Sequence, residues 1–491
     1  MQRPQSETLH RIPVAALTAA ILAWIWIVGR LVVHRHNSYA TFDFDLGIHD
    51  QSLWLLAHGK WFNTVCGLPV FGHHAMFMYY FLVPLVWLGG GPNLWNILQV
   101  IALAAGAIPV FLVARHRLRN AWLACLFGLA WLLLPTVSFL AWETWHPETL
   151  AIPFLLMGYH MATTRPVGVG RHVTRHNIVT FAWLLVAMLW KEDIALAVMG
   201  IALLLIIRRR WKFGLALFGF AAFYFLIIGV WMVPSLAGQT SAYGMLYGDL
   251  GKTPIDVAKT SLQHPSMFFD RLSNNNFKGY IGQLTSPLGF VPLLAPLTLV
   301  MGIPQIFINI LTTANFTWAM MYHYQAVPVV AMILGAVEGA AFLRRHSRVV
   351  GSLAVCLAFV ASCIAANSWG LLPFGAKYNA GYWPHGPHTT AGWDAALKRV
   401  GPTDPVSAHY AFVPHASHRE IIYTFPNPWV RTNFLGDPKL LESPSKIKWL
   451  VIPDNTLGGA AADVLKHLLD SGEYGDAQSV GGVTTYRRLK P

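Results

Sequence analysis

Long apolar runs separated by short clusters of basic residues form the main pattern along the chain. A helix needs about 20 predominantly apolar residues to cross the hydrocarbon core of a bilayer. Runs that approach this length occur at 12–33, 93–113, 120–141, 149–163, 177–190, 192–207, 213–235, 325–343 and 349–371. The pattern therefore predicts a polytopic α-helical membrane protein.

Two other apolar stretches do not fit a plain crossing. Residues 76–88 form a short stretch that ends at a Gly-Gly-Gly-Pro sequence, which indicates an interfacial or re-entrant segment. Residues 287–312 are interrupted by Pro292, Pro296 and Pro304. Because proline breaks helices, we expect a hairpin of two short helices there. This hairpin brings the predicted number of transmembrane helices to about 11.

Basic clusters follow the apolar runs that end near residues 113, 164, 207 and 343. Lys and Arg in short loops are retained on the cytoplasmic side, and all four clusters lie on that side if the N-terminus does. This orientation leaves the loops at about 34–75 and 236–286 outside, together with everything after residue 371. We expect a multi-pass protein of the cytoplasmic membrane with its C-terminal domain on the exterior face.

The chain after residue 371 differs in kind from the apolar part. Short β-rich runs at 405–410, 420–425 and 448–453 alternate with helical stretches at 391–400 and 460–469. Such alternation is typical of a small α/β domain. The predicted organisation is a membrane domain over 1–371 and an exterior soluble α/β domain over 372–491.

Composition supports the membrane assignment and excludes several functions. Residues of the AVILMFWYC set make up 55% of the chain and charged residues only 12%, against about 25% charged in ordinary soluble domains. The net charge of +13 comes largely from the clusters between apolar runs, so no nucleic-acid partner is expected. The sequence has no phosphate-binding GxxxxGK[ST] loop, GxSxG elbow or HExxH helix. Nucleotide-driven pumping and serine or zinc peptidase chemistry are therefore unexpected.

Polar residues that could carry chemistry gather at the exterior ends of the predicted helices. They are Asp43, Asp45 and Asp50 after the first helix, His73 and His74, the run Glu143-Thr-Trp-His146-Pro-Glu148, the turn Lys191-Glu192-Asp193, and His323 with Tyr324. Ionisable residues at membrane depth are costly and tend to mark function. We expect Asp45, His74, His146, Glu148 and Lys191 to line one cavity.

Two chemistries suit such a cluster. A carboxylate can take a proton from a hydroxyl as a general base. Oxygen and nitrogen ligands can also hold a divalent cation, and His74, His146 and Glu148 are the candidate ligands for Mg²⁺ or Mn²⁺. A solvated loop at the aspartates and a hydrogen-bonded network of histidines without metal are the alternatives that the pattern leaves open.

These motifs resemble those of the bacterial membrane-protein family called domain of unknown function 2079, in the GT-C glycosyltransferase superfamily. The matching stretches run in the family order and include Phe44-Asp-Leu-Gly-Ile-His-Asp-Gln51, Gly72-His-His74, Trp145-His-Pro-Glu148, Lys191-Glu-Asp193, His323-Tyr324 and Pro414-His-Ala-Ser-His-Arg419. The resemblance implies a GT-C-like membrane domain with a long first exterior loop, which carries an acidic catalytic residue, and a soluble domain after the last helix.

The resemblance also implies an activity. Enzymes of this superfamily transfer a sugar from a polyprenyl-phosphate carrier to a glycan, lipid or protein acceptor on the exterior face. Asp45 is the expected catalytic base, ahead of Asp43 and Asp50, because it stands in the matching Phe44-Asp-Leu-Gly segment after the first helix, the position at which the superfamily carries its catalytic acid. The other residues of the cluster are expected to bind substrate: His74, His146, Glu148, Lys191, Glu192, Asp193, His323 and Tyr324.

Two functions from other classes remain as alternatives. A transporter or flippase would need ionisable residues at mid-bilayer on broken helices, and Glu338 and the 287–312 hairpin are its only support. A metal-dependent membrane hydrolase would share the predicted ligands but would activate a water molecule. Product analysis separates the hydrolase from the transferase, because only the transferase places the sugar on an acceptor.

Overall fold

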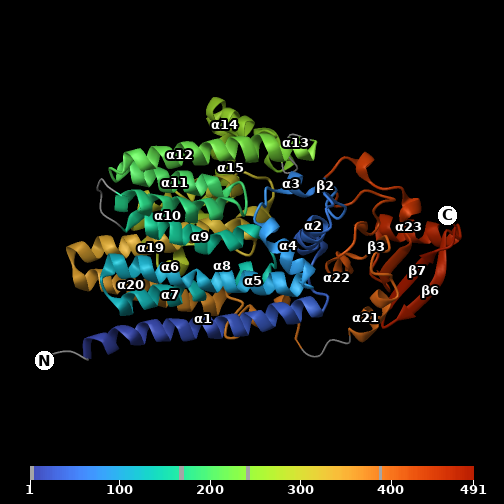
Figure 1. Ribbon diagram of the computed structural model, residues 1–491, viewed down its shortest axis with the longest axis horizontal. Coiled ribbons are helices and arrows are strands. Elements are labelled where there is room, and N and C mark those ends of the chain that lie inside the picture. The colour runs from blue at the N-terminus through green and yellow to red at the C-terminus, as the bar shows by residue number, and fades with distance from the viewer. Residues whose placement is uncertain (1–4, 165–170, 239–243, 386–389, 491) are drawn as a thin grey trace.

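The computed structural model describes residues 5–164, 171–238, 244–385 and 390–490. Figure 1 shows a bundle of long helices, with the N-terminus at one end and a small domain that contains the C-terminus at the other. The long helices are α1 (Gln5–Asn37), α5 (Pro92–Ala105), α6 (Ala107–Leu118), α7 (Ala121–Leu133), α8 (Pro135–Trp142), α9 (Pro147–Thr163), α10 (Arg171–Met188), α11 (Ile194–Ile207), α12 (Trp211–Tyr224) with the π-helical segment Phe225–Met232 and α13 (Val233–Ala237), α19 (Ala326–His346) and α20 (Arg348–Trp369).

Shorter elements form the connections. The first loop contains α2 (Ile48–Ala57), β1 (Phe62–Asn63), β2 (Leu68–Pro69), α3 (Val70–His73) and α4 (Tyr79–Trp87), and the later segment contains a 3-10 helix at Gly244–Leu250, α14 (Pro254–Gln263), α15 (Pro265–Asn274), α16 (Phe277–Thr285), α17 (Pro296–Leu299) and α18 (Ile303–Ile310). Helix α4 has nine residues, which is too short to cross a bilayer.

Several helices have the length and composition of membrane spans. Within the described ranges, five qualify: Arg11–Asn37, Pro92–Leu118, Trp211–Ala237, Asn315–His346 and Arg348–Trp369. A sixth is obtained if α7 and α8, which are bent by 43°, count as one span. The chain is thus a multi-pass membrane protein, and the number of about 11 helices stays a prediction.

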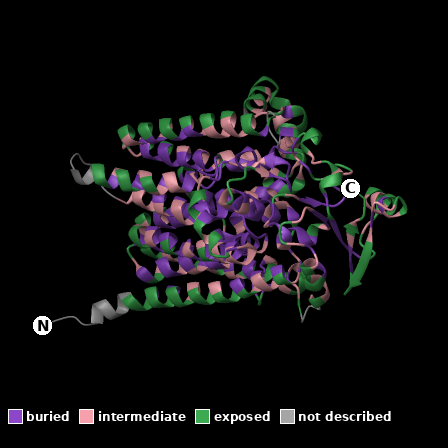
Figure 2. Cartoon of the chain, turned by 45° about the vertical axis from the view of Figure 1, so that its right-hand side comes forward, coloured by how far each residue is buried: buried purple, intermediate pink, exposed green. Residues whose placement is uncertain are grey.

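The outer helices expose large apolar side chains, as expected for a surface in contact with lipid. Leu22 on α1, Phe223 on α12 and Leu353 on α20 are each more than 60% exposed, and the exposed stripes along the outer helices are visible in Figure 2. Soluble proteins rarely expose apolar patches of this extent. These faces therefore point toward the hydrocarbon of a membrane.

Helix α19 is enclosed by the rest of the bundle along most of its length, because all of its residues from Ala326 to Ala341 are buried. Its glycines let the predicted 287–312 hairpin approach closely. A Cβ at Gly339 would lie 2.5 Å from the carbonyl oxygen of Val291, a distance that no real Cβ tolerates. Where two short helices were predicted, the structure has a 3-10 helix at Val291–Leu294 followed by α17 and α18, and this segment packs along α19.

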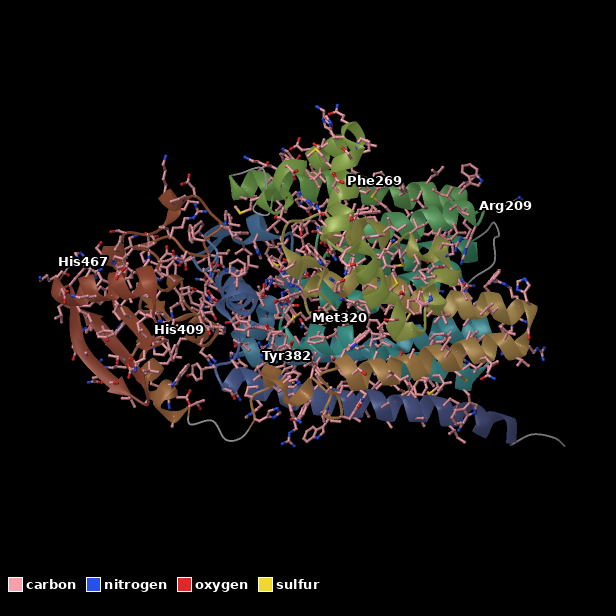
Figure 3. The ribbon with its side chains drawn as sticks, turned by 180° about the vertical axis from the view of Figure 1, so that it is seen from behind. Arg209, Phe269, Met320, Tyr382, His409 and His467 are labelled. Atoms are coloured by element: carbon pink, nitrogen blue, oxygen red, sulfur yellow. The ribbon has the colours of Figure 1, made fainter. Side chains whose placement is uncertain are left out.

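The basic clusters meet at the end of the bundle opposite the C-terminal domain. Glu338 on α19 pairs with Arg117 of α6 at 2.8 Å and with Arg208, which follows α11, at 3.6 Å. Arg344 donates a hydrogen bond to the carbonyl of Leu118. Figure 3 shows Arg209 at one end of the molecule and His467, in the C-terminal domain, at the other. The cluster after residue 164 falls partly on residues 165–170, which lie outside the described ranges.

The C-terminal domain contains a mixed five-stranded sheet with the strand order β4-β3-β5-β7-β6. Its elements are α21 (Ala391–Lys398), β3 (Val406–Ala408), α22 (Val413–Ala416), β4 (Ile422–Thr424), β5 (Trp449–Pro453), α23 (Gly459–Asp470), β6 (Tyr474–Val480) and β7 (Val483–Arg488). Strands β4, β3 and β5 run parallel, and the hairpin β6–β7 is antiparallel. The predicted strands and helices are present, and the hairpin is an addition that the sequence pattern did not predict.

The sheet domain is fastened to the first exterior loop. Thr424 of β4 donates a hydrogen bond to Asp43 at 2.6 Å, and Ser417 donates one to Asp50 at 2.5 Å. The ring of Phe434 lies directly over Gly67, where a Cβ would come within 2.1 Å of it. The loop and the domain therefore hold each other in a fixed position next to the helix ends.

Candidate active site

A cavity of about 480 Å³ lies where the first loop, the α8–α9 connection, the α10–α11 turn and the segment before α19 meet. One part of its wall is charged or imidazole-bearing: Asp45, His49, His73, His74, Glu143, His146, Glu148, Lys191, Asp193 and His323. The rest is apolar or neutral and includes Tyr247, Ile308, Phe316, Tyr324 and Leu435. The five residues expected to line one cavity are all in this wall.

Asp45 stands in a short irregular segment between α1 and α2. Its backbone has φ 68° and ψ −90°, a conformation that is unfavourable for a residue with a Cβ and that clusters at functional sites. The segment is held on both sides, because Asp43 is bonded to Thr424 and Val413 lies against Gly47. The Asp45 side chain is 31% exposed and faces the cavity.

His146 is the ionic partner of Asp45. Its Nε2 lies 3.3 Å from Asp45 Oδ1, and its ring stacks on that of His323 with the centroids 4.0 Å apart. Burial opposes the charged form of His146, but the carboxylates of Asp45, Glu143 and Glu148 together outweigh it and raise the pKa of His146 to about 9, with Asp45 the largest of the three causes. Burial likewise works against an ionised Asp45, yet His146 holds the pKa of that carboxyl well below its usual value.

Lys191 anchors a second group of charges. Its ammonium lies 2.9 Å from Glu148 Oε1 and 3.4 Å from Asp193 Oδ2. Burial lowers the pKa of Lys191, but Asp193 and Glu148 outweigh that effect and keep the pKa well above its usual value. Among the described residues that line the cavity, Lys191 is the only lysine or arginine.

His323 connects the two groups. Its Nδ1 lies 2.9 Å from Glu143 Oε1, and its Nε2 lies 3.9 Å from Glu148 Oε1. Tyr324 also lines the cavity and packs its ring beside that of His323. The charged wall is therefore one continuous network that runs from Asp45 to Lys191.

Some predicted site residues support the wall or lie away from it. His74 lines the cavity, but its Nδ1 pairs with Glu192 at 2.8 Å, and Glu192 also accepts a hydrogen bond from the backbone N–H of Ala75. Glu192 itself is not one of the described residues that line the cavity. Its role is to hold the segment that carries His74.

Asp43 and Asp50, the other predicted catalytic aspartates, do not line the cavity either. Asp43 accepts a hydrogen bond from the hydroxyl of Thr424. Asp50 accepts hydrogen bonds from Ser417 and Trp95, and it lies 3.1 Å from His418 Nε2. Both carboxylates fasten the first loop to its neighbours, and Asp45 is left as the aspartate of this segment that faces the cavity.

The group best placed to hold a metal differs from the predicted set of His74, His146 and Glu148. Ligand atoms of Asp45, His146 and His323 lie within 4.8 Å of one another. His74 and Glu148 instead face Glu192 and Lys191. The new member, His323, was predicted as a substrate-binding residue.

Three charged or imidazole-bearing residues of the wall were omitted from the predicted set: Glu143, His49 and His73. Glu143 begins the run that contains His146 and Glu148, so its neighbours in sequence were the available signal. Burial lowers the pKa of His49 to about 3, and its Nδ1 shares a hydrogen bond of 2.8 Å with the hydroxyl of Tyr79. His49 is therefore a neutral wall residue, and nothing in its spacing distinguishes it from other loop histidines.

The chain matches a known protein family in sequence and two solved structures in fold. A family described as "Predicted membrane protein (DUF2079)" matches residues 35–452, and no curated protein sequence matches. Two solved structures are similar over nearly the whole chain. ArnT from Cupriavidus metallidurans bound to undecaprenyl phosphate is 14% identical, with a TM-score of 0.53 over 97% of this chain and 98% of that one.

ArnT from the same organism in the apo state is 13% identical, with the same TM-score of 0.53 and the same coverage of 97% and 98%. At such identities the likeness speaks for the fold alone, and that fold is of the GT-C type that the sequence motifs led us to expect. The family match extends from the end of α1 to β5 and includes every residue of the charged wall. The chain therefore belongs to the DUF2079 family of membrane proteins and has a GT-C fold.

Proposed function

We propose that the protein is a membrane glycosyltransferase that moves a sugar from a polyprenyl-phosphate carrier to an acceptor hydroxyl of a glycan, lipid or protein. The observation that carries the proposal is the position of Asp45. An ionised carboxylate on a strained, clamped segment faces a cavity of about 480 Å³ at one end of a GT-C helix bundle. A similar fold is that of ArnT, which has been solved with undecaprenyl phosphate bound.

The donor and acceptor are assigned to different parts of the wall. Lys191 is the candidate partner of the donor phosphate, because it is the only lysine or arginine among the described residues of the wall. Asp45 is the candidate base for the acceptor. The apolar wall, with Tyr247 and Ile308, is suited to the first isoprenoid units of the carrier.

In the proposed reaction the acceptor oxygen bonds to the anomeric carbon while the bond from that carbon to the phosphate oxygen breaks. The electron pair of the broken bond leaves with the polyprenyl phosphate, near Lys191. The proton of the hydroxyl passes to Asp45. The low pKa of Asp45 keeps it ionised, and a weak base suffices because the attacking oxygen becomes strongly acidic as its new bond forms. General-base help of this kind is worth roughly 100- to 10,000-fold.

We also propose a divalent metal at Asp45, His146 and His323. His146 fits this role, because it is buried and, within the described structure, its Nε2 has no hydrogen bond beyond the ion-pair contact of 3.3 Å with Asp45, another member of the set. Its Nδ1 lies 3.2 Å from the carbonyl of Thr144, which leaves the Nε2 lone pair for a ligand. A set of two imidazoles and one carboxylate suits Zn²⁺ or Mn²⁺ better than Mg²⁺, which prefers oxygen. When bound there, such an ion would supply positive charge on the acceptor side of the site, where it would lower the pKa of the acceptor hydroxyl beside Asp45.

The proposed location is the cytoplasmic membrane, with the cavity and the C-terminal domain on the exterior side. The support is the collection of basic residues at the opposite end of the bundle, which the positive-inside rule assigns to the cytoplasm. Glu338, which supported a transporter, is tied to Arg117 and Arg208 in that region and also accepts a hydrogen bond from Tyr159. Because these contacts hold the Glu338 carboxylate, Glu338 gives no support to an ion pathway through the bundle.

Replacement of Asp45 by Asn tests the assignment of the base. We expect Asp45→Asn to fold, to retain donor lipid and to transfer sugar at least about 100-fold more slowly. Asp476→Asn is the matched control, because Asp476 pairs with Arg399 on the surface of the C-terminal domain. Transfer by Asp45→Asn at a rate close to that of the control would remove the assignment.

A further inference from the structure

The connection between α8 and α9 carries Glu143 and His146 into the wall of the cavity. It is only four residues long, from Glu143 to His146, and Thr144 has a φ of 81°. A positive φ is unfavourable for threonine, whose Cβ is branched. Something in the surrounding structure must therefore hold this connection in its conformation.

The side chain of Gln99, on α5, holds this connection and the helix ends beside it through hydrogen bonds. Its side-chain nitrogen donates hydrogen bonds to the carbonyl of Leu140 at 2.6 Å and to that of Thr144. Its side-chain oxygen accepts from the backbone N–H of His146 at 2.6 Å and from the hydroxyl of Thr149 at 2.8 Å. The residue is only 1% exposed.

A glutamine side chain has two donor hydrogens and an oxygen with two lone pairs, and each of the four positions has a partner within hydrogen-bond distance. The Thr149 hydroxyl divides its one hydrogen between Gln99 and the carbonyl of His146, which lies 2.6 Å away. The partners also fix which way round the amide lies, because two are carbonyl oxygens and two are N–H or O–H groups. Glutamate matches the shape but has no hydrogen for the carbonyls, and methionine can make none of the four bonds.

We propose that Gln99 is a positioning residue for His146, and through it for the pair of His146 with Asp45. The inference rests on the proposed function. The carbonyl of Thr144 that Gln99 holds is the one that faces His146 Nδ1 at 3.2 Å. Gln99 therefore sets both the backbone of His146 and the tilt of its ring, and this directs Nε2 toward Asp45 at 3.3 Å. A group that is hydrogen-bonded to one ring nitrogen of a functional histidine commonly fixes the orientation of the ring, and so the direction of the other nitrogen.

Asn96, three residues earlier on the same helix, provides a matched control. It is also 1% exposed, and within the described structure neither polar atom of its side chain has a hydrogen-bond partner. Asn96→Leu thus changes a buried amide on the same helix without removing a contact to the α8–α9 connection. Gln99→Met removes two contacts to the connection, at Thr144 and His146, and two to the helices beside it, at Leu140 and Thr149, at nearly constant volume.

The test compares Gln99→Met and Asn96→Leu in the full-length protein in detergent micelles. Hydrogen exchange of the peptide over residues 143–149 should be at least about tenfold faster in Gln99→Met, since even one lost hydrogen bond has an effect of this order. In sugar transfer, kcat should fall about 100-fold, the scale expected for a misplaced reacting group. The KM for the donor should stay within about threefold, because Gln99 does not line the cavity.

Asn96→Leu should match the wild type in both measurements. Equal exchange in Gln99→Met and Asn96→Leu would overturn the inference, and so would faster exchange with an unchanged kcat. If Gln99→Met does not fold, Gln99→Glu takes its place. It keeps the two accepted bonds and loses the two donated ones, so exchange should rise first around Thr144. If the wild type transfers no sugar, the proposed function fails, while the exchange measurement still decides whether Gln99 holds the connection.

Discussion

The pair of Asp45 and His146 predicts a specific dependence of stability on pH in the metal-free protein. The pKa of His146 is raised from its ordinary 6.5 to about 9. A raised pKa of this kind contributes stability that is fully present below about pH 6.5 and is lost as the pH rises through about 9. Each pKa unit corresponds to about 1.4 kcal/mol, so the pair contributes up to roughly 3 kcal/mol. This is an upper bound for Asp45, because Glu143 shares in the shift.

Asp45→Asn removes the main cause of the shift. In this variant the pKa of His146 should return toward its ordinary value, so the variant should be less stable than the wild type at pH 6.5. The difference in the free energy of unfolding should shrink by up to roughly 3 kcal/mol between pH 6.5 and pH 10. Below about pH 4 it should shrink again, because the low pKa of Asp45 stabilises the protein only while the carboxylate is ionised.

Thermal unfolding in detergent with a metal chelator, followed at half-unit steps of pH, measures this difference. Asp43→Asn is the control, since Asp43 is a carboxylate of the same segment that is bonded to Thr424 and not to His146. The control should lower stability by a similar amount at pH 6.5 and at pH 10. A wild-type advantage over Asp45→Asn that stays constant across this range would refute the ion pair.

Three further substitutions have distinct expected outcomes. Lys191→Met leaves the buried Glu148 carboxylate without its cation, so it should cost about 3–5 kcal/mol and weaken donor binding, as measured by thermal unfolding and by a lipid-binding titration. Ser417→Ala removes a hydrogen bond to the Asp50 carboxylate; it should cost about 1.5–3 kcal/mol and speed proteolysis of the C-terminal domain, with turnover unchanged. Glu338→Gln should cost about 3–5 kcal/mol without lowering kcat, because its partners lie at the far end of the bundle; a large fall in kcat would contradict this separation.

The sequence predicted the parts of the site that depend on helix ends. Apolar runs and basic clusters give the direction of each helix, so the polar residues at the opposite ends were expected to converge. His146, Glu148 and Lys191 follow from that argument, although they come from different helices. The strands β3, β4 and β5 were also predictable, because each is a short apolar run between turn residues.

What the sequence did not predict depends on partners that are distant along the chain. Asp50 and Asp45 look alike in sequence, but Asp50 is bonded to Ser417, 367 residues away. The pairing of His323 with Glu143 spans 180 positions. Strand β6 is missed for another reason: it is mostly exposed and polar, so it has no hydrophobic alternation, and its pairing with β7 alone makes it a strand.

The most direct test of the central claim is to follow the sugar. The purified protein, in nanodiscs, is given a polyprenyl phosphate with a radiolabelled sugar and a panel of acceptor glycans and lipids. We expect the label to move from the carrier to an acceptor, polyprenyl phosphate to appear in equal amount, and Asp45→Asn to lower the rate at least about 100-fold. Release of the label as free sugar, or a label that stays on the intact carrier with every acceptor, would show that the protein is not the proposed glycosyltransferase.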